Sequence, residues 1–97
     1  MEREYRVLLI DRDDNVATAL EEIPAGGCFS LQGEKIKRIV CVQRIKFGHK
    51  VAVKAIKKGS PVVKYGQPIG LATVDIAEGE HVHIHNVESQ RGRGDLQ

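Results

Sequence analysis

Residues 72–82, ATVDIAEGEHV, carry a pattern that occurs in two other places along this chain. The pattern is Ala-x-x-x-Ile-x-x-Gly-x-x-apolar, and its copies begin at Ala19, Ala52 and Ala72. In each copy a small residue permits close approach of the backbone, an isoleucine fills the core, and a glycine takes a positive φ in a turn before a new strand. The copies are 33 and 20 residues apart, which excludes a regular solenoid. The pattern predicts a compact β structure that uses one kind of turn three times. The other members of the copies are Ile23, Gly26 and Phe29, then Ile56, Gly59 and Val62, then Ile76, Gly79 and Val82.

Short runs rich in valine and isoleucine, separated by Gly, Pro, Asn or Asp, make up most of the remaining sequence. Residues 15–20 fit either a helical turn, capped by Asp14 or Asn15, or a strand. We expect a mainly β domain over residues 1–88, followed by a polar flexible tail over residues 89–97. The expected strands are residues 5–10, 36–45, 51–55, 61–63, 69–73 and 81–85.

The length and composition fit one small soluble domain and argue against a complete large enzyme. The chain has 97 residues and a mass of 10.7 kDa, with 41% hydrophobic and 29% charged residues. It has no apolar run near the roughly 20 residues of a membrane helix and no signal-peptide pattern at its start, so we expect a cytoplasmic protein that binds no membrane. Its two cysteines, Cys28 and Cys41, are expected to be reduced and buried as small hydrophobic residues.

The net charge of +2 conceals three segments of different sign. Residues 1–34 carry a net charge of −5, residues 35–64 of +10 and residues 65–97 of −3. The basic middle segment could attract an anionic ligand, an acidic partner or a phosphate backbone, or its charges could simply solvate the ends of strands. Because acidic segments flank it and only 4% of the residues are aromatic, we expect no binding to nucleic acid.

The segment His81-Val82-His83-Ile84-His85-Asn86 is the strongest chemical signal in the sequence. On a strand its three histidines would share one face, with Val82 and Ile84 buried behind them. Alternate residues lie about 6–7 Å apart along a strand, which is close enough for two imidazoles to converge on one metal ion. We prefer His83 and His85 as the ligand pair. The alternative is the exposed polar face of an edge strand.

His49 and Lys50 form a second candidate site. Gly48 precedes them in a turn and allows close approach of a ligand to the backbone. A titratable imidazole beside a fixed cation could bind a carboxylate and assist proton transfer. The alternative is that His49 is an ordinary polar turn residue.

Four ordered motifs together resemble a known family. They are DNVATAL at residues 14–20, GHKVA at 48–52, KYGQPIG at 64–70 and GEHVHIHN at 79–86. In this combination they resemble the N-terminal SAF (antifreeze-like) domain of altronate and galactarate dehydratases. The resemblance covers residues 14–86 and implies a β-clip fold, in agreement with the short strands and repeated glycine turns.

The resemblance also implies a function. Members of the family eliminate water from a hydroxylated sugar acid to give a 2-keto-3-deoxy acid, and the SAF unit is either the front of a long dehydratase or a small subunit beside a large catalytic one. A divalent metal, often Fe²⁺, is associated with them. We therefore expect a small anionic hydroxy-acid substrate, a large catalytic partner and little activity of this chain alone. The implied site roles are catalysis by His49 and Lys50, substrate binding by Lys50, Tyr65, Gln67 and Asn86, and metal binding by His83 and His85.

Two alternatives stay open. A related two-subunit enzyme, (2R)-sulfolactate sulfo-lyase, releases sulfite and leaves pyruvate, although Gln67-Pro68 looks more like the sugar-acid dehydratases. SAF-type domains also occur as non-catalytic modules that bind sugars or partners, and a homo-oligomer is compatible with either function. The sequence departs from the family at His81, where members more often carry another residue, so we expect His81 to be incidental to the site.

Overall fold

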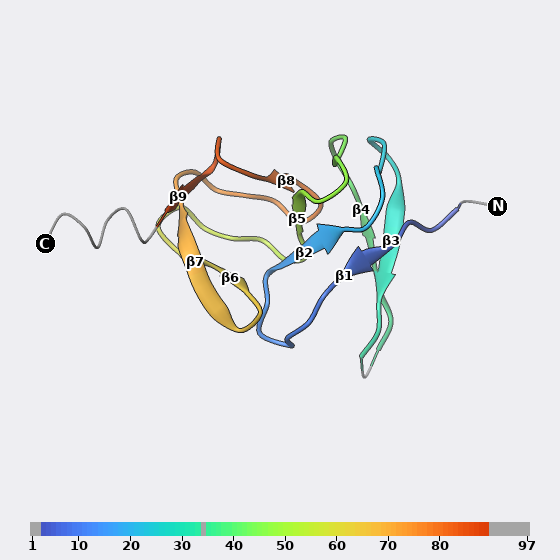
Figure 1. Ribbon diagram of the computed structural model, residues 1–97, viewed down its shortest axis with the longest axis horizontal. Helices are drawn as coiled ribbons and strands as arrows, with labels where there is room; N and C mark the ends of the chain where they lie inside the picture. Colours follow the sequence, from blue (N-terminus) through green and yellow to red (C-terminus); the bar gives the residue numbers. More distant parts are fainter. Residues whose placement is uncertain (1–2, 34, 90–97) are drawn as a thin grey trace, which may run out of the picture.

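The computed structural model describes residues 3–33 and 35–89, and it consists of strands and turns (Figure 1). The described residues contain no helix, and therefore no helix of the length and apolarity needed to cross a membrane. This confirms the expected mainly β class. The strands are β1 (Val7–Leu8), β2 (Val16–Ala19), β3 (Cys28–Leu31), β4 (Lys37–Val40), β5 (Lys50–Ala52), β6 (Pro61–Lys64), β7 (Gln67–Ala72), β8 (His81–Val82) and β9 (Val87–Ser89).

Several expected elements differ in their bounds. Residues 16–19 form a strand and not a helical turn, because they pair with β1 on one side and β5 on the other. The expected strand 81–85 is wrong beyond Val82: the chain turns there, and the Ile84 side chain is 85% exposed instead of buried. Ser89, expected in the tail, pairs with Gly70 in a sheet, and the rest of the expected tail lies outside the described residues.

The structure contains a fourth copy of the repeated pattern, with cysteine in place of the first alanine. Its members are Cys41, Ile45, Gly48 and Val51. A buried cysteine is small enough to fill the place of alanine, and Cys41 is 0% exposed. All four turn glycines have positive φ, as expected for the three copies that the sequence revealed. The values are +88° at Gly26, +84° at Gly48, +86° at Gly59 and +87° at Gly79.

The four copies form two pairs that exchange the same main-chain hydrogen bonds. In the first pair, the N–H groups of Ile23 and Ile45 each donate to the carbonyl of the other, over 2.8 and 2.7 Å. In the second pair, Ile56 and Ile76 do the same over the same distances. Each turn glycine donates its N–H to the carbonyl of the first residue of the partner copy, over 2.7–2.8 Å. The main-chain groups that face the partner copy are therefore satisfied by the main chain of that copy.

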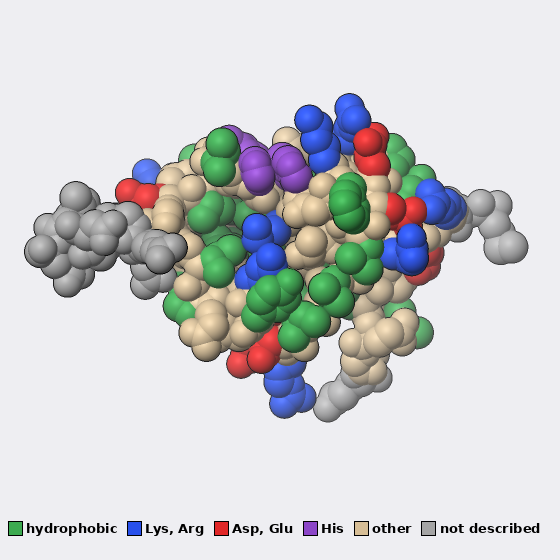
Figure 2. All heavy atoms as spheres, in the orientation of Figure 1, with side chains coloured by type: hydrophobic (Ala, Val, Ile, Leu, Met, Phe, Trp, Pro, Cys, Tyr) green, Lys and Arg blue, Asp and Glu red, His purple; other side chains and the backbone are tan. Residues whose placement is uncertain are grey.

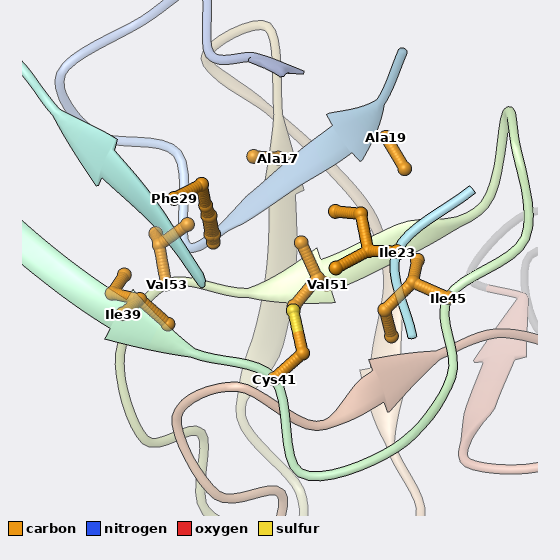
Figure 3. Packing of buried hydrophobic residues seen from close by; sticks show 9 residues of the cluster. All are labelled: Ala17, Ala19, Ile23, Phe29, Ile39, Cys41, Ile45, Val51 and Val53. Carbon is orange, nitrogen blue, oxygen red and sulfur yellow. The ribbon is translucent and has the colours of Figure 1, made fainter. Parts of the chain in front are cut away.

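Strands β2 and β5 are central in an antiparallel sheet of order β1-β2-β5-β8 and separate two hydrophobic cores. Successive side chains of a strand point to opposite faces, so Val51 enters the first core and Ala52 the second. Figure 3 shows the first core, in which Ile23 and Ile45 lie side by side. That core consists of Ala17, Ala19, Ile23, Phe29, Ile39, Cys41, Ile45, Val51 and Val53, and the second of Val16, Ala52, Ile56, Val62, Ala72, Ile76 and Val82.

Both cysteines are buried and free, as the sequence indicated. Burial, followed by the nearby Cys28 sulfur, raises the pKa of the Cys41 thiol to about 11. A protonated thiol in a core is a poor nucleophile, so Cys41 serves as a packing group.

Two smaller sheets complete the fold. Strands β3 and β4 form a hairpin that extends away from the body of the molecule, and β6, β7 and β9 form a three-stranded sheet (Figure 1). Strand β8 follows the copy that begins at Ala72, and it pairs with β5, which follows the copy that begins at Cys41. The residues at this junction form the candidate site.

Candidate functional site

The pairing of β5 with β8 brings together histidines that lie far apart in the sequence. His81 is the Cα partner of Val51, and His49 directly precedes β5. As a result, His49 Nδ1 lies 2.8 Å from His81 Nε2, within hydrogen-bond distance. The ring of His83 stacks on that of His49, with centroids 4.1 Å apart and an interplanar angle of 13°. The structure thus unites the two separate candidate sites of the sequence.

A tight turn after β8 holds His81 and His83 in place. The Asn86 side chain is 2% exposed, and its Oδ1 accepts a hydrogen bond from the His83 N–H over 2.9 Å. Its Nδ2 donates to the His81 carbonyl over 2.8 Å. Because these bonds close the chain on itself, the strand ends at Val82 and Ile84 points to solvent.

His81 belongs to the cluster, contrary to the expectation that it would be incidental. Its main-chain N–H donates to Gln43 Oε1 over 2.9 Å, so a loop from the first half of the chain also positions it. No local pattern indicates Gln43, since the contact joins residues that are distant along the chain. The His85 ring lies 5.0 Å from that of His81 in a tilted arrangement.

The environment favours neutral imidazoles at the centre of the cluster. Partial burial and then the neighbouring His83, Lys46 and Lys50 lower the pKa of His49. Burial and then the surrounding histidines and Lys46 lower the pKa of His81. A neutral imidazole offers a lone pair, which can accept a proton or bind a metal ion.

The histidines fit a divalent transition-metal ion. Each of His49, His81 and His83 offers a nitrogen atom, and these atoms lie within 4.8 Å of one another. Two nitrogen atoms bound to one ion at about 2.0–2.1 Å are about 3–3.4 Å apart, close to the 2.8 Å between His49 and His81. The expected pair His83 and His85 is thus represented in this group by His83, while His85 is outside it.

Lys50 and His83 line a hollow of about 210 Å³ beside the cluster. Burial and then the charge of Lys64 lower the pKa of Lys50. Figure 2 shows histidines at one border of this face, basic side chains at its centre and hydrophobic side chains around them. The other lining residues are Ile69, Val82, Ile84, Val87 and Ser89. Such a hollow suits a small anion with an apolar backbone.

Tyr65 and Gln67 lie apart from the histidines, at the tip of the β6–β7 hairpin (Figure 1). Tyr65 is 49% exposed and has a φ of +56°, and its ring lies 4.7 Å from the Lys64 ammonium. Their expected contact with substrate therefore stays a prediction. The same holds for Asn86, although both polar atoms of its side chain already bind the turn.

Comparison with known families identifies the relatives of this arrangement. Residues 5–90 match the family described as the altronate/galactarate dehydratase SAF domain. The chain belongs to this family. The match spans both repeat pairs, the histidine turn and the β6–β7 hairpin, so the whole described SAF fold is shared with it.

This SAF domain is similar to a minor part of altronate dehydratases and to most of the length of two sulfo-lyase alpha subunits. It is 42% identical to altronate dehydratase of Bacillus subtilis (strain 168), over 82% of this chain and 16% of the relative. It is 44% identical to (2R)-sulfolactate sulfo-lyase subunit alpha of Paracoccus pantotrophus, over 56% of this chain and 81% of the relative. For the same subunit of Chromohalobacter salexigens the identity is 32%, over 84% and 90% of the two chains. The chain thus spans about a sixth of the altronate dehydratase that it matches.

Proposed function

We propose that this chain is the small subunit, or N-terminal-type SAF module, of a sugar-acid dehydratase that eliminates water from a hydroxy acid together with a large catalytic partner. The observation that carries the proposal is a cluster of three histidines, one of which, His83, lines a hollow together with Lys50. The similarity to altronate dehydratases supports the reaction class. The two free cysteines fit the cytoplasm, where such a reaction would take place.

The residues of the site suit the chemical demands of such an elimination. Removing a proton next to a carboxylate requires a base and a cation that stabilises the negative charge that develops. Lys50 is placed to bind the substrate carboxylate in the hollow, and His49 has the lone pair needed to accept a proton. The departing hydroxide needs a proton, which a protonated imidazole of the cluster can return.

A divalent ion, with Fe²⁺ as the expected species, is part of the proposal. His81 and His83 would hold it, since their nitrogen atoms already lie close together, and the lone pair of the neighbouring His49 would stay free to accept the proton. When bound, the ion would supply Lewis-acid stabilisation of negative charge on oxygen. Two ligands from the chain would leave coordination positions open for substrate or for groups from the partner.

The partner follows from how few groups this chain supplies. The described residues place one histidine, His83, and one lysine, Lys50, at the hollow, whereas a complete elimination site also needs groups that enclose the substrate and exclude water. In the sulfo-lyases an SAF unit of this extent is a separate subunit alpha, whereas in the altronate dehydratases it is a minor part of a longer chain. We therefore propose a large catalytic body on the histidine side of the domain.

The similarity to the sulfo-lyase subunits favours one alternative function, release of sulfite from sulfolactate. The cationic hollow would serve that reaction equally well, because the substrate is again a carboxylate with a leaving group on a nearby carbon. A non-catalytic SAF module that binds sugars or a partner is the further alternative, and in that case Lys50 and the histidines would only bind.

Assays of elimination separate these functions. The chain would be purified alone and after co-expression with its candidate large subunit, and both samples would be tested on altronate, galactarate and sulfolactate with added Fe²⁺. We expect activity only in the complex, and a decrease of kcat/KM by about 100-fold or more in Lys50→Gln. Lys57→Gln, an exposed lysine of the same basic segment, is the matched control and should leave activity unchanged. His49→Ala and His85→Ala test the two ends of the cluster.

The outcomes have distinct meanings. Turnover of sulfolactate alone would favour the sulfo-lyase. A complex that forms and binds these acids without turnover would indicate a binding module. Failure to assemble with a large subunit, together with no affinity for the acids, would overturn the proposal.

A further inference from the structure

We infer that Asn86 is the positioning residue of the histidine cluster, and that it sets the directions of His81 and His83 instead of touching substrate. The inference rests on the proposed function for the role of the cluster, but it is argued from hydrogen bonds within this chain. Asn86 is one of two buried polar or charged residues in the described part of the molecule, the other being Asp14.

Every polar group of Asn86 already has a partner within the chain, and three of the four groups bind within the turn. Its Oδ1 and Nδ2 bind the main chain of His83 and His81 over 2.9 and 2.8 Å. Its own N–H donates to the His83 carbonyl over 3.1 Å, and its carbonyl accepts from Thr73 over 3.0 Å. With a side chain only 2% exposed, it has no surface left for a ligand.

The chemistry of the side chain explains why asparagine stands at this position. The turn presents one N–H and one carbonyl to the side chain, so it requires a donor and an acceptor in one short planar group. An aspartate would place a carboxylate oxygen against the His81 carbonyl, and an alanine would leave both main-chain groups buried and unpaired. Asparagine alone among side chains of this length satisfies both.

The consequence for the site is geometric. Two of the three clustered imidazoles, His81 and His83, are attached to the backbone atoms that Asn86 binds, and both rings lie against His49. Groups behind the ligands of a metal site fix the orientation of those ligands, and their loss typically lowers metal affinity by about 10- to 100-fold.

Asn15 provides a matched control elsewhere in the fold. Its Oδ1 accepts from the Val63 N–H over 2.7 Å, and its Nδ2 donates to the Pro61 carbonyl over 2.9 Å. It thus makes the same two kinds of bond to main-chain groups two residues apart, but on strand β6. A purely structural role would leave the histidine ring contacts as intact in a folded Asn86 variant as in Asn15→Ala.

The test compares Asn86→Ala, Asn86→Asp and Asn15→Ala as full-length chains. Contacts among the ring protons of His49, His81 and His83 would be measured by NMR, and the affinity for Co²⁺ from its visible absorption. We expect the Asn86 variants to lose the ring contacts and at least 10-fold in Co²⁺ affinity, and Asn15→Ala to retain both.

Each outcome decides the inference. Unchanged ring contacts in a folded Asn86→Asp, or equal losses in Asn15→Ala, would overturn it. If the parent chain binds no Co²⁺, the metal part of the proposed function fails, while the NMR contacts still decide the role of Asn86. Should Asn86→Ala not fold, Asn86→Asp decides on the same two measurements.

Discussion

The two pairs of repeat copies share a main-chain frame but differ in the side chains that follow their glycines. In every copy the residue after the turn glycine offers its carbonyl to the partner copy, so its side chain is not needed for the bonds between the copies. That residue is Gly27 and His49 in the first pair, and Ser60 and Glu80 in the second. The repeat therefore fixes the backbone and leaves these positions available for chemistry.

The site lies where one copy of each pair meets the other. Strand β5 follows the copy that begins at Cys41 and β8 follows the copy that begins at Ala72, and these strands are neighbours. The strands that follow the copies at Ala19 and Ala52 are β3 and β6, and they belong to other sheets. A chain with such a repeated frame can thus build a site from two equivalent corners without altering either pair.

The largest difference between copies should appear when a turn glycine is replaced by alanine, which adds one methyl group. Gly79 and Gly26 have nearly equal φ, but a Cβ at Gly79 would lie 2.1 Å from the Val40 carbonyl oxygen, whereas one at Gly26 would meet nothing within 4 Å. Gly26→Ala should cost about 1–2 kcal/mol from backbone strain alone. Gly79→Ala should cost about 2–5 kcal/mol, because overpacking against the main chain at Val40 adds to the strain.

Urea unfolding of both variants checks this difference. Equal losses of unfolding free energy would show that the two halves are not in tight contact at Gly79. If Gly79→Ala does not fold while Gly26→Ala does, the order of the two effects is still established.

Replacing Asp14, which joins the loop before β2 to the β6–β7 hairpin, should give the next largest loss of stability. Burial would by itself raise the pKa of Asp14, but hydrogen bonds from the N–H groups of Gly66, Asp11, Tyr65 and Ile10 outweigh it, and the pKa is lowered. The bond from Gly66, over 2.8 Å, joins the β6–β7 hairpin to the loop before β2. Asp14→Asn should therefore cost about 1–3 kcal/mol at pH 7, because it replaces a charged acceptor of several N–H groups.

The pH dependence gives the sign of the Asp14 effect. Because the folded-state pKa is below the unfolded value near 3.8, the stabilisation is complete above that value and is lost as pH falls through the folded pKa. The difference in unfolding free energy between parent and Asp14→Asn should thus shrink between pH 5 and about pH 2. A difference that is constant over this range would contradict the assignment.

Much of this frame could be predicted from the sequence, because its elements are local. The turn glycines follow from a short pattern, and three of the four copies were recognisable. A pattern that requires alanine at its first position does not detect the copy at Cys41, although a small buried cysteine takes the same place. The strand over 81–85 was overextended because alternation of histidine with Val82 and Ile84 mimics a strand, while Asn86 turns the chain.

The site itself was only partly predictable. The residue types were evident, but the approach of His49 to His81 depends on the pairing of β5 with β8, which joins segments some 30 residues apart. Neither the contact of Gln43 with His81 nor the separation of Tyr65 from the cluster has a local signal. Long-range strand order, and not residue chemistry, limited the prediction.

The equivalence of the two pairs predicts equal and moderate losses at their central isoleucines. Ile45 and Ile76 are 0% and 1% exposed and make the same reciprocal hydrogen bonds in their pairs. Removing one methylene from each, as Ile45→Val and Ile76→Val, should lower the unfolding free energy by about 1 kcal/mol. Urea unfolding would measure both. Losses that differ by more than about 1 kcal/mol would mean that the two cores are packed differently despite their common frame.

The smallest effect should come from Ile84, in the segment that follows the copy at Ala72. The corresponding segment after the copy at Cys41 has a different conformation. After the copy that begins at Cys41, Val53 follows the end of β5 in a bend and is buried at 4% exposure, whereas after the copy that begins at Ala72 the chain turns and leaves Ile84 85% exposed. Ile84→Ala should therefore change the unfolding free energy by less than about 0.5 kcal/mol. Val82→Ala, two residues earlier in the second core, is the control and should cost about 2 kcal/mol or more. If instead Ile84→Ala were the more destabilising, the extended strand over 81–85 would be restored, and with it a site in which all three of its histidines share one face.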